Sequence, residues 1–256
     1  MNGQMYQICR IAAAAKKALK EKTALVYEPV SYENRIEFQF LPQKTLYEGK
    51  IYTASSPPDW YDFCAAGELQ DVVLTVPLTV SERSMLGFSN TTGSALLCFF
   101  KETNTYFAAN WTFDSEQNVW NTLYTENERI NVPLMKPQFK DESASFLIVL
   151  EKIKEFAARI DCMEFAGVFQ KAIDILLGTS GFTDAENRLP LPAVPERNLR
   201  IFEAASTADV FGAMGSWNDS PPYLAHKKGL GAEYEELSDE LLKQTRSAFL
   251  YSINEW

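Results

Sequence analysis

Histidine is nearly absent from this chain, since His226 is its single occurrence among 256 residues. One histidine excludes a zinc or iron site built from several histidines of the same chain. It also leaves His226 as the only imidazole for general acid–base chemistry. The serine closest to such a role, Ser216, lies in Met-Gly-Ser-Trp-Asn rather than in the GxSxG pattern of a nucleophile. We therefore interpret His226 as a surface residue and expect no catalytic residue.

Positive charge is also in short supply. The chain has 24 Lys and Arg against 34 Asp and Glu, which gives a formal net charge of −10. Binding along a phosphate backbone needs clustered basic side chains, so we expect no nucleic-acid partner. An acidic surface is suited instead to a basic protein partner. The acids near the C-terminus form either such a surface or a solvated first helical turn, and they are Glu233, Glu235, Glu236, Asp239 and Glu240.

Long apolar segments are missing as well. The longest apolar runs, residues 95–100 and 146–150, are far shorter than the ~18 residues that span a bilayer, so we expect no membrane partner. Residues 1–22 carry five basic side chains and one acid, like an amphipathic presequence, but they lack the apolar core and cleavage site of a secretory signal. They predict a helix packed on the body of a cytoplasmic protein through Met5, Ile8, Ala12, Ala15 and Leu19.

Cysteine pairs of the CxxC type do not occur. The four cysteines are widely spaced and have apolar neighbours, which predicts buried thiols in a reducing compartment rather than disulfides or metal ligands. A P-loop and a complete GxGxxG motif are missing too. We therefore expect no cofactor and no metal.

The first half of the chain has the pattern of a mainly antiparallel sheet. Polar and apolar residues alternate over 33–40, and shorter apolar runs predict further strands. A few polar residues separate the runs at 95–100 and 106–113, which predicts a hairpin. The other short strands are expected at 24–27, 50–54 and 72–76.

Helix signals interrupt this pattern twice. Ser56 and Pro57 predict a helix start, because serine caps and proline fits the first helical turn. The capping-box pattern from Asp114 to Gln117 predicts a second helix through residues 119–123. Sheet and helices together predict an α+β fold.

The second half reads as helical. Beyond a linker-like stretch at 130–143, apolar residues recur at helical spacing over 146–160, 165–177 and 233–253, whereas 198–205 fits either a strand or a helix turn. We expect an α+β sheet subdomain over residues 1–132 and a mainly helical subdomain over 143–256. The two subdomains can share one core.

The segment 209–219, Asp-Val-Phe-Gly-Ala-Met-Gly-Ser-Trp-Asn-Asp, is the least ordinary part of the sequence. Two glycines three residues apart permit a tight backbone path or a positive φ, and polar side chains then flank a large aromatic ring. The pattern is typical of a binding loop. Turn chemistry at 218–221 and a tryptophan that fills the join between the halves explain it equally well. The candidate binding residues are Gly212, Gly215, Ser216, Trp217, Asn218 and Asp219.

This run, followed by Pro221, Tyr223 and an acidic amphipathic helix, resembles the C-terminal part of a group of bacterial proteins. Some members of that group are immunity-type proteins that occur beside toxins. The resemblance covers residues 205–256. It implies a protein of the bacterial cytosol that binds another protein, and it assigns no catalytic residue.

Two other groups of residues have both a functional and a structural interpretation. Asp59 and Asp62 share a helix face beside an aromatic pair, as the acids of glycosidases lie beside aromatic platforms, but helix capping explains them more simply. The segment 110–120 places two tryptophans among hydrogen-bond acceptors, where they either line a groove or are buried.

Three hypotheses follow, the last of which is a purely structural accessory protein. The leading one is a non-enzymatic protein-binding module of the immunity type, with the 212–219 segment as its binding surface. The alternative is a small-molecule-binding protein or an enzyme whose pocket lies near Trp217, between the two halves. A pocket that contains Ser216, Asp219 and a buried acid favours the enzyme, whereas a fully buried Trp217 beneath an acidic face favours the protein-binding module.

Overall fold

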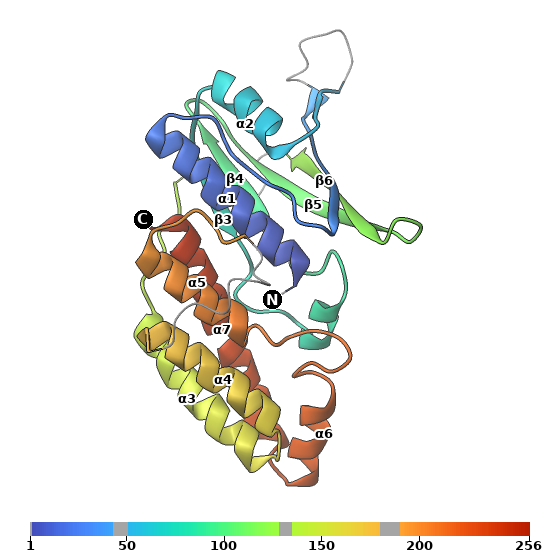
Figure 1. Cartoon of the computed structure of the whole chain (residues 1–256), viewed down its shortest axis with the longest axis vertical. Coiled ribbons are helices and arrows are strands. Elements are labelled where there is room, and N and C mark those ends of the chain that lie inside the picture. The colour runs from blue at the N-terminus through green and yellow to red at the C-terminus, as the bar shows by residue number, and fades with distance from the viewer. Residues whose placement is uncertain (1, 43–50, 128–134, 180–189) are drawn as a thin grey trace.

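The structure is a computed structural model that describes residues 2–42, 51–127, 135–179 and 190–256. It has an α+β fold with a sheet at one end and a group of helices at the other (Figure 1). The described elements are α1 (Gly3–Glu21), β1 (Glu33–Gln39), β2 (Thr53–Ala54), α2 (Pro57–Ala66), β3 (Leu69–Thr75), the short 3₁₀ helix η2 (Arg83–Gly87), β4 (Ala95–Phe100), β5 (Asn104–Asp114), β6 (Val119–Asn127), α3 (Ser143–Arg159), α4 (Met163–Leu177), α5 (Glu196–Ala208), α6 (Ser220–Lys227) and α7 (Gly231–Asn254).

The strands form one sheet in the order β2-β1-β6-β5-β4-β3. Within the described residues, β1 and β6 pair in parallel, and the other four neighbouring pairs are antiparallel. The α+β class is confirmed, but the sheet is mixed. The parallel pair joins two strands that are distant in the chain, so no local pattern could predict it.

The β4–β5 hairpin was predictable because its two apolar strands are separated by a short polar turn. The strand expected at 95–100 is β4, and the strand expected at 106–113 lies within β5. Their backbones pair in antiparallel register, and Phe100 N donates to Thr103 O at 2.9 Å across the turn. This part of the prediction is confirmed.

Two local predictions are wrong. The helix expected at 119–123 is part of β6. Asp114 Oδ1 accepts hydrogen bonds from the N–H groups of Glu116 and Gln117, but these bonds hold the turn between β5 and β6. Pairing with strands on both sides outweighs the local helix signal. Residues 24–27, expected as a strand, have no regular secondary structure.

Helix α2 begins as predicted and fastens one end of the sheet. Ser56 Oγ accepts from Asp59 N at 3.3 Å, which caps the helix. Trp60 on this helix stacks on Phe38 of β1, and Phe38 in turn stacks on Tyr124 of β6. The ring centroids are 4.7 and 4.6 Å apart, so three fully buried aromatic side chains form a continuous stack.

Helix α1 lies over the sheet and contacts β3, β4 and α7 (Figure 1). Its predicted apolar stripe is buried, except that Leu19 is half-buried. Burial extends to two charged side chains, Arg10 and Lys16, each of which faces a carboxylate. Arg10 Nη1 is 3.6 Å from Glu33 Oε2, and Lys16 Nζ is 3.0 Å from Asp71 Oδ1. Both cations can therefore lie in the interior without remaining unpaired.

Within the described residues from 143 onward, the chain is helical and contains no strand. Helices α3, α4 and α7 lie where apolar spacing predicts them, and the ambiguous residues 198–205 belong to α5. Gly178 ends α4 with a φ of +70°, which glycine adopts without strain. Part of the linker-like stretch predicted at 130–143, residues 130–134, lies outside the described residues.

Buried apolar side chains form one large cluster that includes Phe38 and Phe107 of the sheet as well as Phe156, Phe202 and Phe249 of the helices. The cluster therefore draws on both halves of the chain. The division into subdomains 1–132 and 143–256 stays a prediction. All four cysteines are buried, as expected of small apolar side chains, and no disulfide links any two of them.

The outer edge of β3 is closed by side chains rather than by another strand. Asn254, on the last turn of α7, accepts from Leu74 N and donates to Leu74 O, both at 2.9 Å. Lys16 donates to Val72 O at 3.1 Å. Asn254 therefore mimics a neighbouring strand, which satisfies an edge that would otherwise expose unpaired backbone groups.

Replacing Asn254 with alanine tests this closure of the β3 edge. The change leaves the buried N–H and C=O of Leu74 without partners, and each unsatisfied group costs about 1–3 kcal/mol. We therefore expect the free energy of unfolding in urea to fall by about 2–4 kcal/mol. The matched control is Asn110→Ala at an exposed position of β5, where we expect a change within about 0.5 kcal/mol. Equal losses in the two variants would contradict the role of Asn254.

Candidate functional site

The predicted binding loop, residues 212–219, connects α5 to α6. Its tryptophan, Trp217, is fully buried among helices. The ring lies against Phe165 and Phe169 of α4 and stacks on Tyr234 of α7 at a centroid distance of 5.6 Å. Its Nε1 donates to Ser238 Oγ at 2.8 Å. Trp217 therefore joins α4 to α7, and no face of its ring is open to a ligand.

The other polar groups of the loop hold the loop itself in shape. Gly215 has a φ of +77°, and its N–H donates to Asp219 Oδ2 at 2.7 Å. Ser216 Oγ donates to Gly212 O at 2.9 Å and accepts from Asn218 N at 3.2 Å. These hydrogen bonds within the loop stabilise it as a turn.

The loop also supports η2, which belongs to the first half of the chain. Asn218 Nδ2 donates to Arg83 O at 2.9 Å. At Gly87, a Cβ atom would lie 2.6 Å from Ala213 N and 2.7 Å from Gly212 C. The two backbones therefore approach so closely that only glycine fits at position 87. The loop and η2 form one rigid contact between the halves.

A polar pocket of about 310 Å³ opens beside this contact. Asn218 and Tyr234 line it, whereas Ser216, Trp217 and Asp219 do not. Arg83 reaches across it to both Glu235 and Asp239. Burial alone would lower the pKa of Arg83, but these two carboxylates outweigh burial and raise it.

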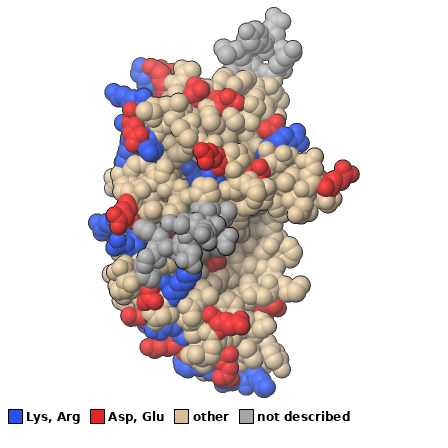
Figure 2. Space-filling view, viewed as in Figure 1, with Lys and Arg blue, Asp and Glu red and all other residues tan. Residues whose placement is uncertain are grey.

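The acids at the start of α7 are therefore largely paired with basic side chains. Glu235 and Asp239 contact Arg83, Glu233 contacts Arg159, and Glu240 lies 3.7 Å from Lys243. On the face that Figure 2 shows, acidic and basic residues are interspersed. The predicted acidic partner surface thus consists, in its described part, mainly of residues that already have partners.

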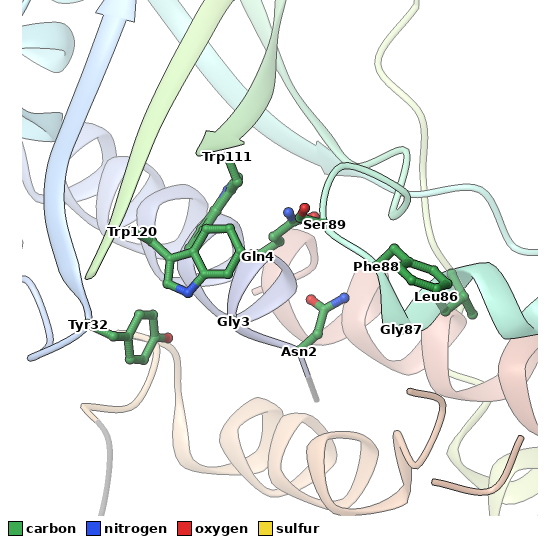
Figure 3. A pocket seen from close by; sticks show the side chains of 10 residues that line it. All are labelled: Asn2, Gly3, Gln4, Tyr32, Leu86, Gly87, Phe88, Ser89, Trp111 and Trp120. Carbon is green, nitrogen blue, oxygen red and sulfur yellow. The ribbon is translucent and has the colours of Figure 1, made fainter. Parts of the chain in front are cut away.

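A second pocket, of about 450 Å³, lies on the other side of η2 (Figure 3). Four aromatic rings face it from three parts of the chain. Trp111 and Trp120 come from neighbouring strands β5 and β6, Tyr32 precedes β1, and Phe88 follows η2. The first turn of α1 completes the lining with Asn2, Gly3 and Gln4, together with Leu86, Gly87 and Ser89.

Backbone contacts hold these aromatic side chains in place. Trp120 N donates to Tyr32 O at 2.7 Å. Asn90 accepts from Trp111 N at 2.7 Å and donates to Trp111 O at 3.0 Å. The Trp111 and Trp120 rings are tilted by 59° with centroids 5.8 Å apart, so together they form an angled wall.

Three polar atoms in the lining are buried and have no hydrogen-bond partner: Gln4 Nε2, Tyr32 Oη and Trp111 Nε1. Burial and the nearby charge of Glu33 raise the pKa of Tyr32 to about 12, so its hydroxyl stays protonated at neutral pH. The amide, the phenol and the indole are all able to donate. Other buried polar atoms of the described residues also lack a partner, but here three donors gather in the lining of one pocket, which makes it the candidate functional site.

Sequence reasoning reached this site only in part. The sequence predicts that the two tryptophans of segment 110–120 either line a groove or are buried. Both line the pocket, and Trp111 is buried as well. The contribution of Tyr32, Phe88 and the start of α1 had no sequence signal, because these segments meet only in the folded chain. The predicted loop contacts η2 at Gly87, a residue that lines the pocket.

The remaining candidate residues do not line this pocket. His226 is exposed on α6. Asp59 is exposed, and its Oδ2 accepts from Ser55 Oγ at 2.6 Å, which lowers the pKa of Asp59. Among the described residues, no three His, Cys, Asp or Glu side chains gather as a metal-binding group.

Comparison of the chain with protein-family models, curated proteins and solved structures finds no match. In the described part of the chain, no helix combines the length and apolar character that crossing a bilayer requires. We therefore infer the function from the residues of the pocket.

Replacing Gly87 with alanine tests the contact that supports the pocket wall. The new methyl group meets backbone atoms, which cannot rotate away as a side chain can, so we expect a loss of about 1–3 kcal/mol in unfolding free energy. Gly167→Ala in α4 is the matched control, because a Cβ there has nothing within 4 Å. The control is expected to gain up to about 1 kcal/mol from helix propensity. If Gly87→Ala left the free energy of unfolding unchanged, the close backbone contact at this position would not require glycine.

Replacing Trp217 with alanine tests whether the loop tryptophan is structural. Removing a fully buried tryptophan costs about 3–5 kcal/mol, and we expect a loss of this size in urea unfolding. Met214→Ala, at a 94% exposed position of the same loop, is expected to be neutral. A Trp217→Ala protein of unchanged stability would contradict the structural role and return Trp217 to the binding hypothesis.

Proposed function

We propose that this protein binds a small organic molecule, and that the aromatic pocket between α1, the β5–β6 strands and η2 holds a ring of that molecule. The observation that carries the proposal is the gathering of four aromatic side chains with three unpartnered hydrogen-bond donors in one cavity. This proposal takes up the small-molecule alternative. Its pocket differs from the one predicted, because Trp217 does not line it.

The size and chemistry of the cavity support a ligand of this kind. Its volume of about 450 Å³ falls within the range of roughly 300–1,000 Å³ that small-molecule sites occupy. Such sites combine apolar and aromatic walls with a few polar groups that orient the ligand. Here Trp111 and Trp120 supply an angled wall for a flat ring, while Phe88 faces them from the η2 side (Figure 3).

The groups that line the pocket are suited to holding a molecule rather than to transferring protons. The ten lining residues contribute rings, amides, a phenol and a serine hydroxyl. Tyr32, with its pKa raised to about 12, stays protonated at neutral pH. We therefore propose recognition as the activity of this site. The hypothesis that the protein is of the immunity type and binds a toxin through residues 212–219 stays a prediction.

Titration with phenylacetamide, a neutral ring-bearing probe, tests the proposed function. We expect the indole N–H signals of Trp111 and Trp120 to shift in NMR spectra, whereas that of Trp217 stays in place. Phe88 is 59% exposed, so Phe88→Ala should leave stability unchanged. Each aromatic contact is worth about 0.5–1.5 kcal/mol, so this variant should weaken binding roughly two- to tenfold.

The matched control is Tyr223→Ala, which removes an equally exposed aromatic ring from α6, outside the pocket lining. It should bind phenylacetamide like the unaltered protein. Shifts spread evenly over all tryptophan signals, or no saturable shift at any probe concentration, would refute the aromatic pocket as a ligand site.

A further inference from the structure

We infer that the molecule bound in the aromatic pocket carries a carboxylate, and that this anionic group sits against the first turn of α1. The inference rests on the proposed function and names its ligand class, an aromatic or ring-bearing carboxylate. Two independent features support it: the position of the α1 N-terminus in the pocket, and the three buried donors without partners on the residues that line it.

The N-terminus of α1 forms one wall of the pocket, because Asn2, Gly3 and Gln4 all line it (Figure 3). The first N–H groups of a helix have no partner within the helix. Asn2 caps the helix and satisfies one of them, since its Oδ1 accepts from Met5 N at 2.9 Å, whereas the bond from Tyr6 N to Asn2 O at 3.1 Å is the first regular bond of the helix. The first turn contains no acidic side chain. A 19-residue helix thus presents its positive end to the cavity without a carboxylate of its own.

The orientation of Gln4 is determined by a neighbour. Its Oε1 accepts from Asn90 N at 3.1 Å, so the amide cannot turn without losing this bond. Its Nε2 is left as a buried donor without a partner, on a side chain that is only 8% exposed. Asn90 also holds the backbone of Trp111, whose Nε1 is likewise unpartnered and whose side chain is 5% exposed. One asparagine therefore positions two orphaned donors.

The third donor, Tyr32, lies against the start of the same helix. A Cβ built on Gly3 would be 3.5 Å from Tyr32 Oη, so the hydroxyl borders the first turn. The raised pKa of Tyr32 keeps this group protonated. Amide, indole and phenol donors thus line the pocket beside a helix N-terminus. An anionic oxygen pair is the acceptor that satisfies such a set most strongly.

The charges around the pocket permit an anion. Glu33, the buried acid that follows Tyr32 in the chain, is held by Arg10 and accepts hydrogen bonds from Gln7, Tyr27 and Val30 N. Its charge is therefore compensated within the core. None of the ten residues that line the pocket is acidic.

Paired probes separate this inference from the proposed function. Phenylacetate and phenylacetamide share the ring and differ in the charge of one group. In NMR or calorimetric titrations we expect phenylacetate to bind at least fivefold more tightly at low salt. The advantage should shrink as ionic strength rises, because salt screens the charge of the probe.

The Gln4→Glu variant distinguishes the charged probe from the neutral probe most clearly. It keeps an oxygen to accept from Asn90 N and replaces the unpartnered amide nitrogen with a charged oxygen. We expect phenylacetate binding to weaken at least tenfold, while phenylacetamide binding stays within about threefold of the unaltered protein. Gln70→Glu makes the same charge change at an exposed position of β3 and should alter neither affinity.

Tyr32→Phe keeps the test decisive if Gln4→Glu fails to fold. This variant removes a buried hydroxyl that has no partner, so stability should stay the same or rise, and the affinity for phenylacetate should fall several-fold. Equal affinities for the two probes in the unaltered protein would overturn the carboxylate inference and leave the pocket as a neutral-ligand site. If neither probe binds, both the inference and the proposed function are overturned.

Discussion

The ion pair between Arg10 and Glu33 is the constraint on which the rest of the structure depends. Helix α1 is buried along most of its length, and burying a guanidinium without a counter-charge would be strongly unfavourable. Glu33 supplies that charge from the first residue of β1, and Tyr27, Gln7 and Val30 N complete its hydrogen bonds. The network fixes where α1 lies on the sheet. It therefore also fixes where the N-terminus of α1 opens into the aromatic pocket.

The pocket is assembled from segments that are far apart in the chain, and each segment is held by a different kind of contact. The start of α1 is positioned by the buried ion pair, and the tryptophan strands by sheet pairing. The η2 wall is held by the glycine contact between Gly87 and the 212–219 loop. The 212–219 loop, which the sequence predicts as a binding surface, thus supports the η2 wall of the pocket. Its unusual composition follows from the close backbone approach and from the tryptophan that joins α4 to α7.

Sequence reasoning succeeded where the signal was local. The apolar run of β4, the Gly178 end of α4 and the Ser56 cap of α2 each follow from a few adjacent residues. It failed where partners are distant, as at residues 119–123, because β6 is a strand only through its pairing with β1 and β5. The site falls in the second class. Two tryptophans could be noticed in the sequence, but their relation to Tyr32 and Gln4 depends on tertiary structure alone.

The orphaned donors distinguish this pocket from an ordinary packing gap. A void between aromatic side chains is common wherever large rings meet at an angle, and it needs no ligand. Unpartnered buried amide, indole and phenol groups are different, because each costs about 1–3 kcal/mol as long as it lacks an acceptor. Gln4 gains a bond from Asn90 with its oxygen, while its nitrogen remains unpartnered beside the N-terminus of α1. A fold that tolerates three such donors in the lining of one cavity has a surplus of hydrogen-bond donors there, and the carboxylate that we propose would supply the acceptors that the chain itself omits.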